Sequence, residues 1–325
     1  MEVPPPKIAK DIYLYSPPFP LFHRHLETIY PALFRRVEIF APHQERIPTP
    51  DNDFLDLDWY KLGSGKLVII SHGLEGNSKR AYVLGMAKVF LGAGFDVLAW
   101  NYRGCSAEMN LAKRFYHSGA TDDLDTIVIH AAKRQAYKSI NLIGFSLGGN
   151  LTLKYLGEGF SSSSGISKSV AISVPLNLDS SSEALARGDN WLYVRRFLTS
   201  LKKKVKEKGG RIEIPNIERL GSIKTLRDFD DLITGPLHGF RNADDYYRQC
   251  SSLYFLPKIK TPTLIINARN DPFLGEDCFP ESNMGNPLQF LYPAFGGHVG
   301  FTLFNERKLF WSEIKALEFI TRSET

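Results

Sequence analysis

Short apolar runs and stretches of helical spacing alternate along most of this chain. The continuous apolar run at 67–70 predicts a strand buried on both faces, and runs that are mostly apolar predict further strands of the sheet at 95–100, 139–143, 169–174, 263–268 and 288–292. Between them apolar residues recur every three or four positions, as at Val83, Met86, Ala87 and Phe90, which is typical of helices packed on a sheet. The pattern predicts an α/β fold with a mostly parallel central sheet flanked by helices.

Other segments depart from this alternation. Residues 37–40 and 54–59 alternate apolar and polar side chains and predict half-buried strands. Residues 1–36 are proline-rich and then amphipathic, and we expect them to form an N-terminal covering segment. Residues 176–258 are helical in pattern and rich in charge, with five lysines between 202 and 208 that predict a solvated helix face.

Composition places the chain among globular proteins. A hydrophobic content of 43% and a net charge of +5 do not indicate nucleic-acid binding or a membrane span. Three widely spaced cysteines do not form a disulfide framework, and the first residues lack the pattern of a secretory signal. We therefore expect a cytoplasmic protein, while weak peripheral membrane contact and the oligomeric state stay open.

The strongest local motif is Gly144-Phe145-Ser146-Leu147-Gly148. It stands between a predicted strand and a predicted helix, and this arrangement is the nucleophile elbow of α/β-hydrolases. The glycines allow a sharp turn that presents the Ser146 hydroxyl above the sheet edge. Ser146 is therefore the predicted nucleophile. The core then comprises 37–175 and 259–325, and 176–258 is a helical cap insertion.

A serine nucleophile needs a base, and the base needs an orienting carboxylate. In this fold they follow the serine in the order acid, then histidine. Asp271 comes just after the strand at 263–268 and is the predicted acid, with Glu276 and Asp277 as more distant rivals. His298 is the predicted base, since it alone of the eight histidines follows Asp271.

An oxyanion hole requires two backbone donors. One is expected from the residue after the nucleophile, Leu147, and the other from a loop after an early core strand. The segment Ser71-His72-Gly73-Leu74-Glu75-Gly76 follows the strand at 67–70, so we predict the N–H of Leu74 as the second donor.

No cofactor or metal is expected. The chain has no dinucleotide or Walker motif, and His23 and His25 lack a third ligand for a metal site.

The chain resembles α/β-hydrolase family 4, the YheT-like hydrolases, over nearly all of its length. The matching segments include 25–31 (with Glu27 where the family usually has glutamine), 72–76, 101–106 and 144–150, the cap segments 229–231, 239–240 and 245–247, and 270–273 and 297–301. The resemblance implies a serine hydrolase with Ser146, Asp271 and His298 as its triad. It leaves the substrate open, because such families include carboxylesterases, acylglycerol lipases and phospholipases.

The sequence thus predicts a serine esterase that cleaves a small-molecule acyl ester or lipid through an acyl-enzyme. Two alternatives remain at this point. An acyltransferase would use the same residues with an alcohol in place of water, and a catalytically silent binding protein would keep only the scaffold.

Overall fold

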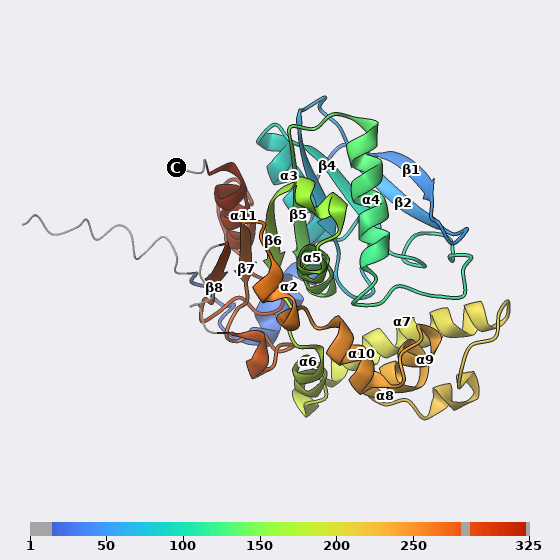
Figure 1. Ribbon diagram of the computed structural model, residues 1–325. Coiled ribbons are helices and arrows are strands. Elements are labelled where there is room, and N and C mark those ends of the chain that lie inside the picture. The colour runs from blue at the N-terminus through green and yellow to red at the C-terminus, as the bar shows by residue number, and fades with distance from the viewer. Residues whose placement is uncertain (1–14, 281–286, 323–325) are drawn as a thin grey trace, which may run out of the picture.

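One sheet of eight strands forms the centre of the described part of the protein (Figure 1). The structure is a computed structural model that describes residues 15–280 and 287–322, so the predicted covering segment is described only from residue 15 onward. The strands lie in the order β1-β2-β4-β3-β5-β6-β7-β8, and all neighbours from β4 to β8 pair in parallel. Their bounds are β1 (His43–Pro48), β2 (Phe54–Tyr60), β3 (Lys66–Ser71), β4 (Asp96–Asn101), β5 (Ser139–Phe145), β6 (Ile166–Ile172), β7 (Thr263–Ile266) and β8 (Leu288–Leu291).

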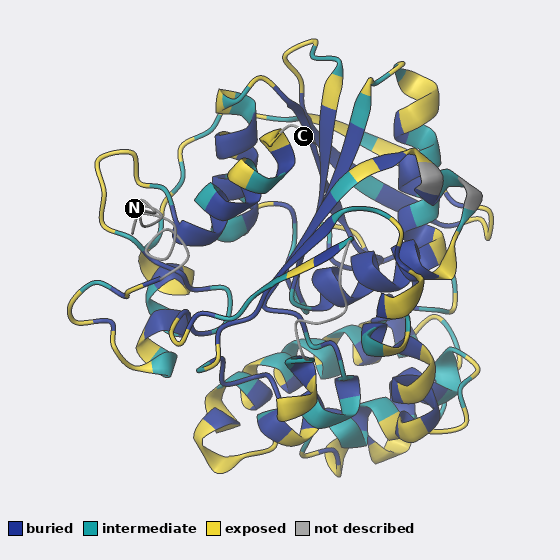
Figure 2. Ribbon diagram, turned by 60° about the vertical axis from the view of Figure 1, so that its left-hand side comes forward, coloured by how far each residue is buried: buried dark blue, intermediate teal, exposed yellow. Residues whose placement is uncertain are grey.

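Helices cover both faces of this sheet. On one face, α4 (Thr121–Arg134) and α5 (Leu147–Glu158) pack their apolar sides on the sheet in one core cluster. On the other, α3 (Ala81–Gly92) and α11 (Trp311–Thr321) contribute to a second cluster. Figure 2 shows the strands buried between these helices. The predicted α/β-hydrolase fold with a mostly parallel sheet flanked by helices is confirmed.

The segment between β6 and β7 forms a layer of helices beside the sheet (Figure 1). We call this layer the cap, and it has its own apolar core, which includes Val194, Leu198, Phe229 and Ile233. Its helices are α6 (Leu178–Leu185), α7 (Trp191–Gly209), α8 (Leu226–Phe229), the π-helix η4 (Asp230–Thr234), α9 (Gly235–Leu237) and α10 (Ala243–Cys250). The domain limits at 176 and 258 stay a prediction.

Short 3-10 helices complete the described elements: η1 (Ser161–Gly165), η2 (Gly188–Asn190), η3 (Ile217–Gly221), η5 (Ser252–Tyr254), η6 (Leu256–Lys258) and η7 (Glu276–Cys278). Before the sheet, α2 (Arg24–Phe34) is the one α-helix described in the N-terminal segment. Among residues 15–280 and 287–322, none of the helices has the length and apolar character needed to cross a membrane.

Three local predictions are wrong. Residues 54–59 belong to a strand, β2, but it is not half-buried, since only Asp56 in it is partly exposed. Residues 37–40 form no strand; they run extended with Val37 and Ile39 half-buried, and Ile39 packs against the core without pairing. The first strand is instead β1, which pairs with β2 alone and buries only Ile47, so its hydrophobic signal is weak.

The lysine run on α7 is also not a uniformly solvated face. Lys208 is 1% exposed and donates to Asn110 Oδ1 and to the Arg114 carbonyl, both at 2.8 Å. Burial lowers the pKa of Lys208 to about 8. Lys204 is also largely buried and pairs with Glu75 at 2.8 Å. These two lysines fasten the cap to the core, while Lys203 and Lys206 face solvent.

Candidate active site

Ser146 stands at a strained turn between β5 and α5. Its φ of 53° and ψ of −120° lie in a region that side chains rarely adopt. The turn depends on glycine, because a Cβ at Gly144 would lie 2.2 Å from the Gly148 carbonyl oxygen. A Cβ at Gly148 would lie 2.5 Å from the carbonyl oxygens of Ser71 and His72. The close approach of β3, β5 and α5 therefore explains both glycines of the motif.

His298 lies between Ser146 and Asp271. Its Nε2 is 2.9 Å from Ser146 Oγ, and its Nδ1 is 2.9 Å and 3.1 Å from the two carboxylate oxygens of Asp271. An Nδ1–H that donates to Asp271 leaves Nε2 free to accept the serine proton. Asp271 is buried, and its Oδ1 also accepts from the N–H of Phe273 at 2.9 Å. The structure thus brings together the three side chains selected from the sequence.

The N-terminal helix α2 supports the histidine loop. The N–H of His298 donates to Thr28 Oγ1 at 2.9 Å, and that hydroxyl donates to the Arg24 carbonyl at 2.7 Å. Asn270 links the same loop to α2: it accepts from the N–H of Gly297 at 3.0 Å and donates to Glu27 Oε2 at 2.6 Å. Sequence reasoning assigned none of these roles, although the segment 25–31 carried a family signal.

Glu27 is completely buried in this contact. Its burial raises the pKa of the carboxyl, and the hydrogen bond from Asn270 opposes that shift. Glu27 therefore places a buried carboxyl, rather than an amide, next to Asn270 and behind the histidine loop.

The loop after β3 carries Leu74, which lines the same pocket as Ser146. The N–H of Gly73 donates to the Tyr82 hydroxyl and that of Glu75 to the Tyr116 hydroxyl, each at 2.9 Å. Between them, the N–H of Leu74 has no acceptor among the described residues. The N–H of Leu147, at the first position of α5, has none there either. Two backbone donors without an acceptor among the described residues thus belong to residues that line the same pocket as Ser146.

His72, in the same loop, is not a rival base. It is fully buried, its Nδ1 donates to the Gly73 carbonyl at 2.7 Å, and its Nε2 accepts from the N–H of Tyr102 at 3.3 Å. Burial lowers its pKa to about 3, so the ring is neutral. With both ring nitrogens engaged, it shapes the loop beneath Leu74.

Two cavities meet at Ser146. The inner arm, of about 130 Å³, runs under the cap and is lined by residues such as Phe229, Asp230, Tyr246 and Tyr247. The outer arm, of about 190 Å³, runs toward α2 and is lined by residues such as Ile29, Leu33, Arg80 and Arg196. Both are lined by Leu74, Ser146, Phe197, Phe273 and His298. An ester bound at Ser146 can thus extend its two halves in two directions.

Other reactive groups do not join this site. Cys105, Cys250 and Cys278 are free and buried, and burial raises the pKa of each thiol, which keeps it protonated. In the described ranges no three His, Cys, Asp or Glu side chains are arranged to hold a metal ion. His23 instead caps α2, because its Nδ1 accepts from the N–H of His25 at 3.3 Å.

Comparisons with known proteins identify the fold and the family of this chain. The family described as the alpha/beta hydrolase fold matches residues 66–278. YheT of Escherichia coli is 34% identical over 91% of this chain and 90% of its own length. The monoacylglycerol lipase of Saccharomyces cerevisiae is 29% identical over 85% of this chain and 71% of its own.

Among solved structures, the esterase Pf2001 of Pyrococcus furiosus has a TM-score of 0.60 and covers 95% of this chain and 97% of its own. At 20% identity this is a likeness of fold alone. The family match over residues 66–278 and the 34% identity to YheT show the family: this chain belongs to the α/β-hydrolase family and, within it, to the YheT-like hydrolases.

Proposed function

We propose that this carboxylic ester hydrolase cleaves acyl esters through an acyl-enzyme formed on Ser146. The observation that supports this most is the line of contacts from Ser146 Oγ through the His298 ring to the buried carboxylate of Asp271. A serine hydroxyl is a weak nucleophile at neutral pH, and an adjacent base held by a carboxylate is what activates it.

In the acylation step, Ser146 Oγ attacks the ester carbonyl carbon while His298 Nε2 takes the hydroxyl proton. Asp271 holds the ring in the tautomer that exposes Nε2 and stabilises the imidazolium that forms. The N–H groups of Leu74 and Leu147 stabilise the negative charge on the carbonyl oxygen, since neither is engaged elsewhere among the described residues. His298 then gives its proton to the leaving alcohol.

Deacylation reverses these roles with water as the nucleophile. His298 removes a proton from water, the hydroxide oxygen attacks the acyl carbonyl, and the proton returns to Ser146 Oγ as the acid leaves. The strained backbone of Ser146 keeps Oγ within hydrogen-bond distance of His298 Nε2 throughout.

The substrate we propose is a small-molecule acyl ester of lipid type. The arms that meet at Ser146 carry many aliphatic and aromatic side chains, which suit an acyl chain. The name of the yeast relative, monoacylglycerol lipase, points to the same class.

A fluorophosphonate probe tests the nucleophile. The wild-type protein should be labelled and should hydrolyse p-nitrophenyl esters of graded chain length, and Ser146→Ala should lose both properties while staying folded. Ser222→Ala, which removes an exposed hydroxyl of the cap, is the matched control and should behave like the wild type. Persistent labelling of Ser146→Ala would show another nucleophile, and an unlabelled wild type would favour a silent binding protein.

Acyl transfer to an alcohol is a second candidate, favoured by one observation. Because both arms open at Ser146, an alcohol can occupy one arm while the acyl group of the enzyme lies in the other. Product analysis with added alcohol separates the two reactions: ester formation at the expense of free acid indicates transfer.

A further inference from the structure

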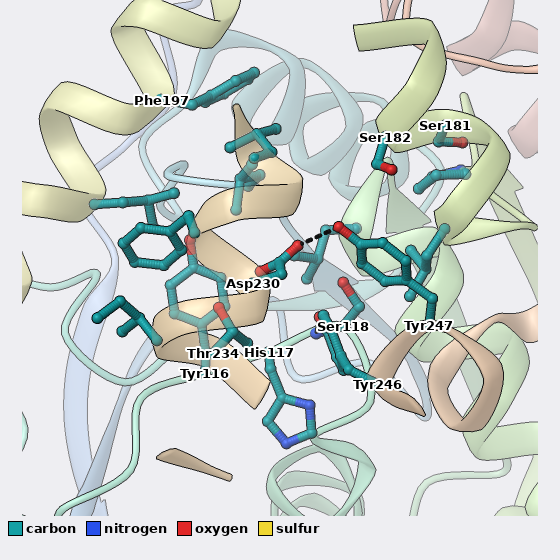
Figure 3. A pocket seen from close by; sticks show the side chains of 18 of the residues that line it. Tyr116, His117, Ser118, Ser181, Ser182, Phe197, Asp230, Thr234, Tyr246 and Tyr247 are labelled. Carbon is teal, nitrogen blue, oxygen red and sulfur yellow. Dashed lines mark hydrogen bonds between the residues drawn. The ribbon is translucent and has the colours of Figure 1, made fainter. Parts of the chain in front are cut away.

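The inner arm contains a carboxylate that the proposed mechanism does not use. Asp230 is the first residue of the π-helix η4, and its side chain lines the arm together with Ser146. Figure 3 shows it in the middle of this pocket, joined to the Tyr247 hydroxyl at 2.8 Å. π-Helical turns are rare and occur often at functional sites.

Asp230 lies deep in the molecule, yet part of its surface stays accessible because it faces the pocket. Burial raises the pKa of this carboxyl to about 6, against the effect of hydrogen bonds from Thr234 and Tyr247. The group is therefore mostly ionised at neutral pH. A buried charge without full compensation is costly, and proteins retain such groups mainly where they bind or react.

The nearest cation does not neutralise Asp230 by direct contact. Arg227 acts on it through space, but its guanidinium forms ion pairs with Asp179 and Asp244. The carboxylate accepts hydrogen bonds from Tyr247 and Thr234, and since an ionised carboxylate has about four acceptor positions, it keeps acceptor capacity toward the pocket.

The polar residues that line the arm around Asp230 carry mainly hydroxyl groups. Thr234, Ser118 and Ser182 also line the arm with hydroxyl groups. Thr234 donates to Asp230 and Ser182 donates to the Asp179 carbonyl at 2.9 Å, so their oxygens remain as acceptors. Lys204 also lines the arm, and its positive charge, like that of Arg227, is already balanced by carboxylates. A ligand hydroxyl can donate to the Asp230 carboxylate, and it needs no charge of its own to do so.

We propose that the inner arm binds the half of the ester that carries a hydroxyl group, and that Asp230 accepts a hydrogen bond from it. This inference rests on the esterase function proposed above and adds its substrate class: a hydroxylated acyl ester, with the hydroxyl on the acyl chain or on the alcohol. Asp230 is a specificity-determining residue, because it contacts the substrate away from the reacting atoms.

Two matched ester pairs test the inference. The first pair is a 1-monoacylglycerol and the propyl ester of the same acid. The second pair consists of two p-nitrophenyl esters, one of an ω-hydroxy acid and one of the acid in which a methyl group replaces the ω-hydroxyl. The wild type should prefer the hydroxylated member of at least one pair in kcat/KM. Asp230→Leu should reduce that preference by about 10- to 100-fold, the usual worth of a hydrogen bond to a charged group.

Asp230→Asn keeps the shape and an acceptor oxygen, so it remains informative if Asp230→Leu does not fold. Its neutral acceptor should reduce the preference by about 3- to 10-fold. Asp231→Asn is the matched control: it changes the next carboxyl of η4, which is exposed, accepts from the N–H of Ala243 and does not line the arm. This control should keep the wild-type preference.

Equal rates within both pairs for the wild type would overturn the inference, and so would an Asp230→Leu variant that slows both members of each pair equally. A wild type that hydrolyses none of the four esters would count against the proposed function, and the inference would fall with it. Hydrolysis without a hydroxyl preference counts against the inference alone.

Discussion

The hydroxyl of Thr28 accepts a hydrogen bond of 2.9 Å from the N–H of His298, although the two residues lie 270 positions apart. The contact places α2, a helix outside the sheet, directly behind the proposed base. It holds the histidine loop at a point where two backbone angles are unusual: φ is 55° at Gly297 and 56° at Val299. We infer that α2 is part of the catalytic support rather than only a cover.

Thr28→Val should therefore reduce kcat/KM. Valine has nearly the shape of threonine but lacks the acceptor, so the His298 loop loses its anchor and the ring loses its fixed distance to Ser146. A displacement of about 1 Å typically costs up to about 100-fold in rate, and we expect a loss of 10- to 100-fold. The measurement is steady-state kinetics with a p-nitrophenyl ester.

Thr28→Ser is the matched control, because it keeps the hydroxyl and should retain activity close to the wild type. If Thr28→Val is as active as Thr28→Ser, the contact is structural and does not position the base.

The oxyanion assignment leads to a second prediction. Tyr82 and Tyr116 accept from the N–H groups on either side of Leu74 and so fix the orientation of this peptide segment. Tyr82→Phe and Tyr116→Phe should each lower kcat, by up to about 10-fold, with little change in KM, because the donor acts on charge that develops only in the transition state.

Tyr254→Phe removes an exposed hydroxyl of the same kind and should leave kcat unchanged. A change confined to KM in the Tyr82 and Tyr116 variants would mean that the loop shapes binding, and the N–H of Leu74 would lose its assigned role.

Much of the fold could be predicted because its signals are local. The buried parallel strands are rich in apolar residues, and the turn at Ser146 needs glycine at Gly144 and Gly148 for steric reasons visible in five residues. The order serine, acid, histidine along the chain then selects Asp271 and His298, although the sequence does not show how far these residues lie from Ser146 in space. Their contacts with Ser146 in the structure agree with that selection.

The features that could not be predicted depend on contacts between distant segments. Periodicity assigns Lys204 and Lys208 to a charged helix face, but the partners that bury them, Glu75 and Asn110, lie in loops of the core. Asp230 belongs to a segment recognised by resemblance, yet only the fold turns it into the pocket beside Ser146. An edge strand such as β1 is hard to predict because charged residues interrupt its hydrophobic pattern.

The elbow glycines give a prediction about stability. At Gly148 an added Cβ would overlap the Ser71 and His72 carbonyl oxygens at 2.5 Å, and backbone atoms cannot yield as a flexible side chain can. Gly148→Ala should lower the free energy of unfolding by about 1–3 kcal/mol or more, measured by chemical denaturation.

Gly92→Ala is the matched control, since Gly92 lies in α3 with no atom within 4 Å of the added Cβ. It should be neutral or stabilising by up to about 1 kcal/mol. Equal stability of the two variants would show that β3 and α5 are not packed as closely as described.

His72 should make the protein less stable in mild acid. Its pKa is about 3 in the folded state because of burial, against an ordinary value of 6.5. Between these values the unfolded chain binds a proton that the folded protein does not, so the free energy of unfolding falls as the pH falls from about 6.5 toward 3. The contribution of this one residue to the slope is about 1.4 kcal/mol per pH unit.

His72→Asn removes the titrating group and keeps a side-chain donor near the Gly73 carbonyl. It should be less stable than the wild type at pH 7, but its free energy of unfolding should fall less steeply from pH 6 to pH 4, by about 1.4 kcal/mol per pH unit. His43→Asn, at an exposed histidine in β1, should keep the wild-type slope. Identical slopes for all three proteins would mean that His72 takes up a proton in the folded state, which its buried contacts with Gly73 and Tyr102 do not allow.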